Sequence, residues 1–154
     1  MSLPAVNAGD LFREHMQHAT PEGRQLKDYV AAGAEVPVDL PTDIVCAALP
    51  EPGHDWLLCN YPKTVDQAEA LARRGFEPQA FIELVMTAKD VNRSDFRLAE
   101  YRREDTLQAL PRYEMRMAPV RSRFRTRGTY RSTSGFGEPE DVERRILAII
   151  AELE

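Results

Sequence analysis

A cluster of seven arginines is the strongest feature of this sequence that could take part in chemistry. It extends from Arg112 to Arg131 and is opposed by one acidic residue, Glu114. Guanidinium groups bind carboxylates and phosphates, so the cluster predicts a surface for an acidic partner such as a nucleic acid, an acidic tail or a nucleotide phosphate. The alternative is a solvated helix face with interspersed packing residues. The predicted partner-binding residues are Arg112, Arg116, Arg121, Arg123, Arg125 and Arg127.

The other reactive side chains predict little chemistry. Cys46 and Cys59 have no CxxC partner, and we expect them to stay reduced. His15 and His18 have a helical i,i+3 spacing, but no further ligand motif completes a metal site. We therefore expect no metal and no cofactor.

Composition narrows the function classes. The 154 residues carry a net charge of −5, which argues against a dedicated nucleic-acid binder. No apolar run approaches the roughly 18 residues of a membrane span, and the first residues do not resemble a leader peptide. We expect a cytoplasmic protein that does not enter a membrane.

Apolar runs alternate with amphipathic segments, which predicts an α/β fold with a parallel sheet covered by helices, in a single domain over residues 1–154. Pro111 and Pro119 should kink or break the long helix near the end. The expected strands cover residues 3–8, 55–61, 80–86 and 128–134. The expected helices cover residues 10–18, 20–33, 40–49, 64–75, 94–124 and 139 to the end.

Four stretches, in the same order along the chain, resemble the adenylate kinase family. The first is similar to the family's G-D-(L/M)-(L/I)-R segment, the second to its G-x-x-V-P turn, and the third to the segment containing D-G-(Y/F)-P-R-T. The fourth is similar to the family's closing G-x-G-S-P-E-E-V. The stretches are Gly9–Arg13, Gly33–Pro37, Trp56–Ala68 and Gly135–Val142.

This resemblance implies an adenylate-kinase-like P-loop NTPase fold and a site for a nucleoside monophosphate. It implies that Arg13 contacts the phosphate and that the turn around Val36 lies beside the base. The residual nucleotide-binding residues that it implies are Gly9, Arg13, Val36, Lys63 and Gln67.

The sequence also departs from the family's pattern. The family begins with a strand and a G-x-x-x-x-G-K-[ST] loop that cradles the phosphates, and no such motif occurs in these 154 residues. We therefore expect a domain that is incomplete at the N-terminus and lacks the first, central strand of its sheet. Cys59 replaces an acidic residue that helps to organise magnesium, and Lys63 replaces an arginine.

Three functions remain open. We favour a non-catalytic scaffold whose partners are other protein chains of an assembly, one of which would supply a strand to the sheet. Divergent members of the family recur in ciliary and flagellar axonemes, which implies that setting by resemblance. The second is an ATP:AMP phosphotransferase whose phosphate loop comes from a longer chain or a partner. The third is a sensor that binds AMP or ADP without turnover. Since phosphoryl transfer needs its groups to act together, we expect no catalytic residues in the isolated chain.

Overall fold

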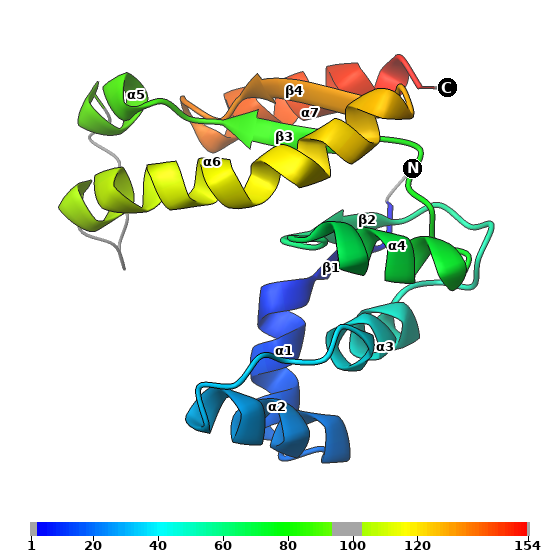
Figure 1. Cartoon of the computed structure of the whole chain (residues 1–154). Coiled ribbons are helices and arrows are strands. Elements are labelled where there is room, and N and C mark those ends of the chain that lie inside the picture. Colours follow the sequence, from blue (N-terminus) through cyan, green and yellow to red (C-terminus); the bar gives the residue numbers. More distant parts are fainter. Residues whose placement is uncertain (1–2, 94–102, 154) are drawn as a thin grey trace. The chain divides into compact units, whose positions relative to one another are not determined.

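The computed structural model describes residues 3–93 and 103–153, which fall into two compact units, Met1–Glu77 and Pro78–Glu154 (Figure 1). Each unit holds one pair of parallel strands with helices packed against it. The α/β class and the helix-covered parallel strands are therefore confirmed. The single domain over residues 1–154 stays a prediction.

The first unit is built on strands β1 (Ala5–Asn7) and β2 (Leu57–Cys59), which are parallel and in register at Val6 and Leu58. Both strands are shorter than the apolar runs that predict them, because the ends of each run leave the ladder. The helices of this unit are α1 (Ala8–Gln17), α2 (Pro21–Ala31), α3 (Asp39–Ala48) and α4 (Val65–Arg73).

Polar side chains set where three of these helices begin. Asn7, Thr20 and Thr64 each accept a hydrogen bond from a backbone N–H in the first turn of the helix that follows. Such caps satisfy donors that have no partner within the helix. After α2, Gly33 adopts a φ of 60°, a conformation that glycine takes without strain. The predicted start of α2 and the predicted cap of α4 are confirmed.

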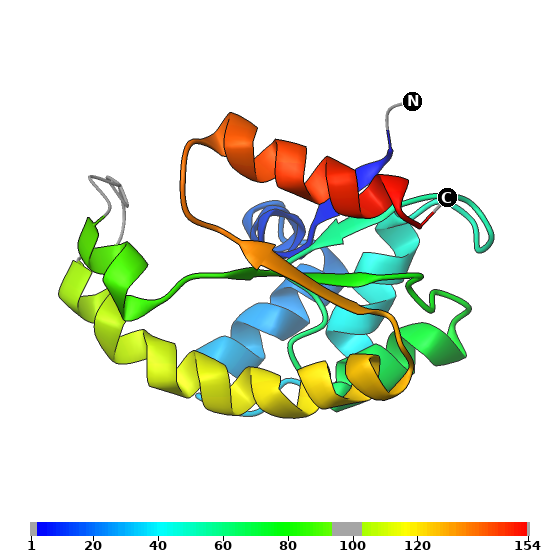
Figure 2. The ribbon, with the colours of Figure 1, turned by 90° about the horizontal axis from the view of Figure 1, so that it is seen from above.

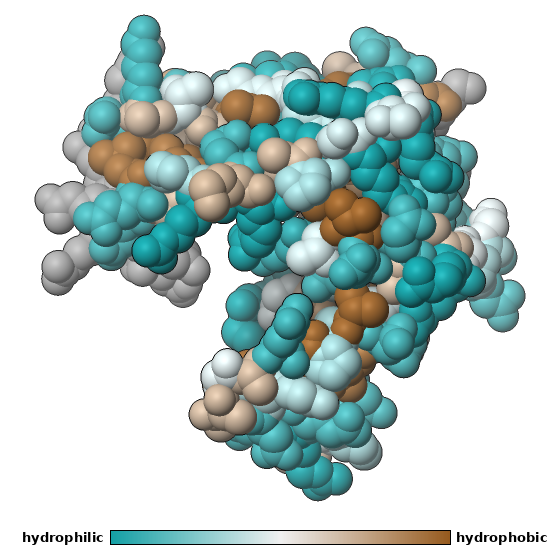
Figure 3. All heavy atoms as spheres, viewed as in Figure 1, coloured by the Kyte–Doolittle hydropathy of each residue, from teal (hydrophilic) through white to brown (hydrophobic). Residues whose placement is uncertain are grey.

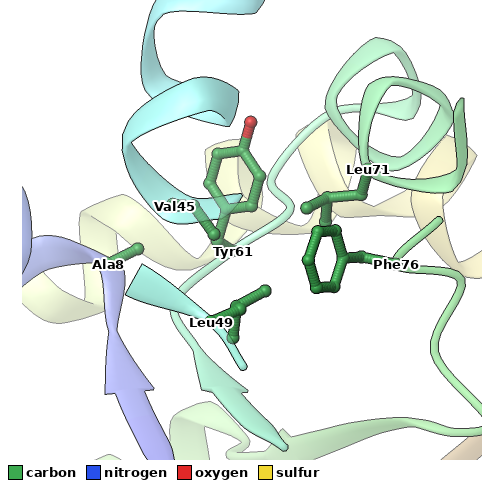
Figure 4. Packing of buried hydrophobic residues seen from close by; sticks show 6 residues of the cluster. All are labelled: Ala8, Val45, Leu49, Tyr61, Leu71 and Phe76. Carbon is green, nitrogen blue, oxygen red and sulfur yellow. The ribbon is translucent and has the colours of Figure 1, made fainter. Parts of the chain in front are cut away.

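One apolar cluster forms the core of the first unit (Figure 4). Its members come from α1, α3 and α4 and from the segments that follow α3, β2 and α4, and Val6 and Leu58 of the strand pair pack against it. Phe12 of α1 packs edge-on against Tyr61, with ring centroids 6.4 Å apart. The buried members are Ala8, Val45, Leu49, Tyr61, Leu71 and Phe76.

The second unit is built on strands β3 (Phe81–Val85) and β4 (Tyr130–Ser134), which are also parallel. Helices α6 and α7 lie on opposite faces of this pair (Figure 2). On the α6 side, Phe81 stacks on the buried Phe124 with ring centroids 4.6 Å apart. The helices are α5 (Ala88–Arg93), α6 (Arg103–Thr126) and α7 (Pro139–Ala151).

The long helix α6 differs from what the sequence predicts. We expected a kink or a break at Pro111 and Pro119; a break is wrong, because α6 runs through both prolines, and a kink stays a prediction. Both prolines are exposed, and the helix curves along its length (Figure 2). The helix is anchored instead by Val120 and Phe124, which are fully buried. The predicted helical residues 94–102 lie outside the described part of the chain, and α5 was not predicted.

The loss of a central strand stays a prediction. Within residues 3–93 and 103–153, each sheet has two strands, so β2 and β3 each have one edge without a partner strand.

We predict that Gly23→Ala destabilises the first unit. A Cβ atom at Gly23 would lie 1.9 Å from the carbonyl oxygen of His15, so α1 and α2 must move apart to admit a methyl group. Such overpacking against backbone should lower the free energy of unfolding by about 3 kcal/mol. Urea unfolding followed by circular dichroism measures this. The exposed control Arg24→Ala on the same helix should change it by less than about 0.5 kcal/mol, and equal effects would contradict the close packing.

Candidate functional site

The carboxyl ends of β1 and β2 bring two of the predicted site segments to the same end of the strand pair. Both strands run in the same direction, so the segments that follow them start on the same side of the pair. After β1, α1 begins with Gly9 in its first turn. After β2, the chain passes through Asn60 to Lys63 and enters α4. Gly9 therefore follows the end of β1 and Lys63 follows the end of β2, on the same side of the strand pair.

The carboxamide of Asn7 ties these two segments together. Its oxygen accepts from the N–H groups of Gly9, at 3.0 Å, and Asp10, at 3.4 Å. The same oxygen accepts from the side-chain amide of Asn60, at 3.2 Å. Asn60 has a φ of 64°, so the chain turns sharply there. Sequence analysis did not identify Asn7 or Asn60 as site residues, although an asparagine just before a helix is a recognisable cap signal.

Arg13 lies over the start of α1. A Cβ atom at Gly9 would lie 3.6 Å from a terminal nitrogen of Arg13, so a larger residue at that position would crowd the guanidinium. Arg13 also forms an ion pair with Asp10, and both side chains are mostly exposed. Exposed pairs of this kind contribute at most about 1 kcal/mol, so an anionic ligand can displace the aspartate at low cost.

Lys63 and Gln67 are linked at the start of α4. Gln67 accepts from the backbone N–H of Lys63 at 2.8 Å, and its own N–H donates to Thr64 at 3.2 Å. This reciprocal arrangement fixes the helix start. The side-chain oxygen of Gln67 is therefore occupied by the N–H of Lys63. The NH2 group of the same side chain can still donate to a ligand.

The remaining predicted positions differ in character. Val36 is half-buried in the loop between α2 and α3. Cys59 is half-buried at the end of β2, and burial raises the pKa of its thiol. A neutral thiol cannot replace the carboxylate that the family resemblance implies for organising magnesium. The nucleotide-binding roles of Gly9, Arg13, Val36, Lys63 and Gln67 stay predictions.

The arginine cluster lies on α6, in the turn that follows it and at the start of β4. Figure 3 shows hydrophilic residues along much of the visible side of α6, with smaller apolar areas between them. Arg125 lies over the ring of Tyr130, with its guanidinium carbon 4.6 Å from the ring centroid. Arg123 lies over the ring of Phe124 in the same way, at 5.0 Å. The exposed members are Arg112, Arg116, Arg125 and Arg127.

Arg121 differs from the other predicted partner-binding residues because it turns inward. Its side chain is 13% exposed and bonds both oxygens of Glu83, at 2.6 and 2.8 Å. It also bonds Glu114 at 2.8 and 2.9 Å. Glu83 had no predicted role because it lies 38 residues from Arg121 in the sequence. The partner-binding role of the cluster stays a prediction.

Glu83 is a buried carboxylate whose oxygens accept four hydrogen bonds in all. Besides Arg121, the hydroxyl of Tyr130 donates at 2.7 Å and that of Tyr113 at 3.2 Å. Burial alone would raise the pKa of Glu83, but the hydrogen bonds from Arg121 and Tyr130 outweigh it and hold the pKa below its ordinary value. Burial, together with the nearby Glu83 charge, raises the pKa of Tyr113 to about 12. The group is therefore charged at Glu83 and protonated at both tyrosines near neutral pH.

We predict that Arg121→Ala costs about 3 kcal/mol of unfolding free energy at pH 7, because it leaves a buried charge without its main partner. In the wild type, the lowered pKa of Glu83 means that its contribution is present above the unfolded value of about 4.3 and is lost as pH falls further. In the variant, burial should raise the pKa of Glu83, so stability should increase as pH falls from 7 toward 5.

Urea unfolding at several pH values measures both effects. The matched control Arg116→Ala removes an exposed arginine of the same helix and should change stability by less than about 0.5 kcal/mol. A variant at Arg121 that keeps the wild-type pH profile would show that Glu83 does not depend on this guanidinium.

None of the helices in residues 3–93 and 103–153 has the length and apolar character of a membrane span. In the same ranges, no group of three or more His, Cys, Asp or Glu side chains is arranged to hold a metal ion.

Comparison with known proteins places these features in a family. The family model described as adenylate kinase matches residues 1–129. The adenylate kinase of Leifsonia xyli subsp. xyli is 31% identical over an alignment that covers 97% of this chain and 81% of the relative. That of Clavibacter michiganensis subsp. michiganensis is 33% identical, with 97% and 80% covered. A shorter match, 41% identical, covers 45% of this chain and 33% of the adenylate kinase of Symbiobacterium thermophilum. This chain belongs to the adenylate kinase family.

Proposed function

We propose that this chain is the monophosphate-binding part of an ATP:AMP phosphotransferase, and that the phosphate loop for ATP is supplied by a longer chain or a partner. The arrangement of residues at the carboxyl ends of β1 and β2 supports the proposal. Arg13 lies against the start of α1, and Lys63 and Gln67 begin the helix after β2. The relatives that we report are named adenylate kinases, which supports the same ligand class.

Physical chemistry favours a phosphate at this edge. The positive end of the helix dipole at the first turn of α1 favours anions, while the N–H groups of Gly9 and Asp10 are already bonded to Asn7. Arg13 and Lys63 add two positive charges. Hydrogen bonds between a charged donor and an anion contribute about 1.5–3 kcal/mol each, enough to hold a monophosphate ester with modest affinity.

The strand edges support an outside source for the phosphate loop. Phe81 N–H donates to Thr129 O at 2.9 Å and Gly135 N–H donates to Val85 O at 2.9 Å, so alternate residues of β3 face β4. The residues between them, Ile82 and Leu84, direct their backbone groups to the edge without a partner strand in the described chain. Leu84 is 44% exposed there. Such an edge accepts an added strand readily.

The relatives give no support to the scaffold hypothesis, and the neutral thiol at Cys59 speaks only against catalysis by the isolated chain. The names of the relatives give no support to a non-catalytic or axonemal role. The sensor reading uses the same monophosphate site and differs from the kinase in turnover alone. A cytoplasmic location stays a prediction.

AMP binding tests the site. In isothermal titration calorimetry on the purified chain, AMP should bind, and Arg13→Ala and Lys63→Ala should each weaken it about tenfold, the equivalent of one charge-assisted hydrogen bond. Arg73→Ala, which removes an exposed arginine from the far end of α4, is the matched control and should bind AMP as the wild type does. Equal affinity in all four proteins would refute the placement of the phosphate.

A phosphotransfer assay tests whether the phosphate loop for ATP comes from outside these 154 residues. The purified 154-residue chain, given ATP, AMP and magnesium in a coupled assay, should show no phosphotransfer, because its sequence contains no G-x-x-x-x-G-K-[ST] loop to bind the polyphosphate. Activity that disappears in Lys63→Ala would show that the chain is a complete enzyme, against the proposal.

A further inference from the structure

A buried pair of hydroxyl groups connects two loops of the proposed monophosphate site. The Tyr61 hydroxyl lies 2.6 Å from Thr42 Oγ1, which in turn lies 2.6 Å from the carbonyl oxygen of Val38. A carbonyl can only accept, so Thr42 donates to Val38 and accepts from Tyr61. Thr42 is 0% and Tyr61 7% exposed, so both bonds are shielded from solvent and costly to leave unmade.

The connected loops carry different parts of the site. Tyr61 follows β2 and stands two residues before Lys63, whose N–H is held by Gln67. Val38 stands two residues after Val36 and is the cap residue of α3, a helix that has no side-chain cap of its own. The Tyr61 hydroxyl points toward α3 (Figure 4). The hydroxyl pair is therefore a direct link between the start of α4 and the start of α3.

The ring of Tyr61 is held independently of its hydroxyl. It lies in the core cluster with Val45 and Leu71 and packs edge-on against Phe12. Burial raises the pKa of Tyr61 to about 12, so the hydroxyl keeps the proton that it donates throughout the neutral range. Removing the oxygen alone should leave the ring in place and break only the link.

We propose that the Tyr61 hydroxyl is a positioning group that sets the separation between the base side of the site, at Val36, and the phosphate side, at Lys63. This inference rests on the proposed function. A ligand that spans both sides depends on the separation, whereas a ligand that reaches the phosphate side alone does not. The ratio between the affinity for a ligand that spans both sides and the affinity for a ligand of the phosphate side alone therefore measures the positioning effect of the hydroxyl.

The test compares AMP with ribose 5-phosphate by calorimetry on the 154-residue chain. Tyr61→Phe should weaken AMP about fivefold, the equivalent of one net hydrogen bond, and change ribose 5-phosphate less than about twofold. Thr42→Val removes the middle of the link and should have the same effect. Thr42→Ser keeps both hydrogen bonds and should restore the wild-type ratio, which keeps the test decisive even if Tyr61→Phe does not fold.

Ile44→Val controls for general loosening of α3. Ile44 is buried on that helix but belongs to neither loop, so the variant should lower the unfolding midpoint and leave the affinity ratio unchanged. An unchanged ratio in Tyr61→Phe, or an equal shift in Ile44→Val, overturns the positioning role while AMP binding itself still stands. A wild-type chain that does not bind AMP overturns the proposed function instead.

Discussion

The side chain of Asn7 joins the two segments that follow the carboxyl ends of β1 and β2, and the proposed site depends on this connection. One oxygen accepts from two N–H groups of α1 and from Asn60, which lies 53 residues further along the chain. Parallel pairing alone brings the two strand ends to the same side. The carboxamide adds a direct bond between the segments that follow, so the start of α1 and the approach to α4 share one polar anchor.

A buried charge has the corresponding role in the second unit. Glu83 would destabilise the β3–β4 pair if it stood alone, because burial penalises a carboxylate. Four hydrogen bonds from Arg121, Tyr113 and Tyr130 satisfy it and tie α6 to the strands. Part of the arginine cluster therefore serves packing. The exposed arginines of α6 keep the predicted capacity for an acidic partner, and Arg121 has a structural use that its neighbours do not share.

Family membership and turnover are separate questions for this chain. The proposed monophosphate site has two cationic side chains, Arg13 and Lys63, while Cys59 presents a neutral thiol where the family resemblance implies an acid. Phosphoryl transfer depends on groups that act as a unit, so a site for one substrate does not imply catalysis. Within the described residues, each strand pair keeps edges without a partner strand, which is the kind of edge that can accept an added strand.

The sequence by itself determined the local structure: the alternation of strands and helices, the caps at Thr20 and Thr64, and the stop at Gly33, because these depend on neighbouring residues. It also identified the family through motifs that are short and contiguous. Tertiary structure alone decided that α6 continues through its prolines, since burial of Val120 and Phe124 outweighs two lost backbone bonds. It alone paired Glu83 with Arg121 and Tyr61 with Thr42, because contacts between distant residues leave no periodic signal in a single sequence.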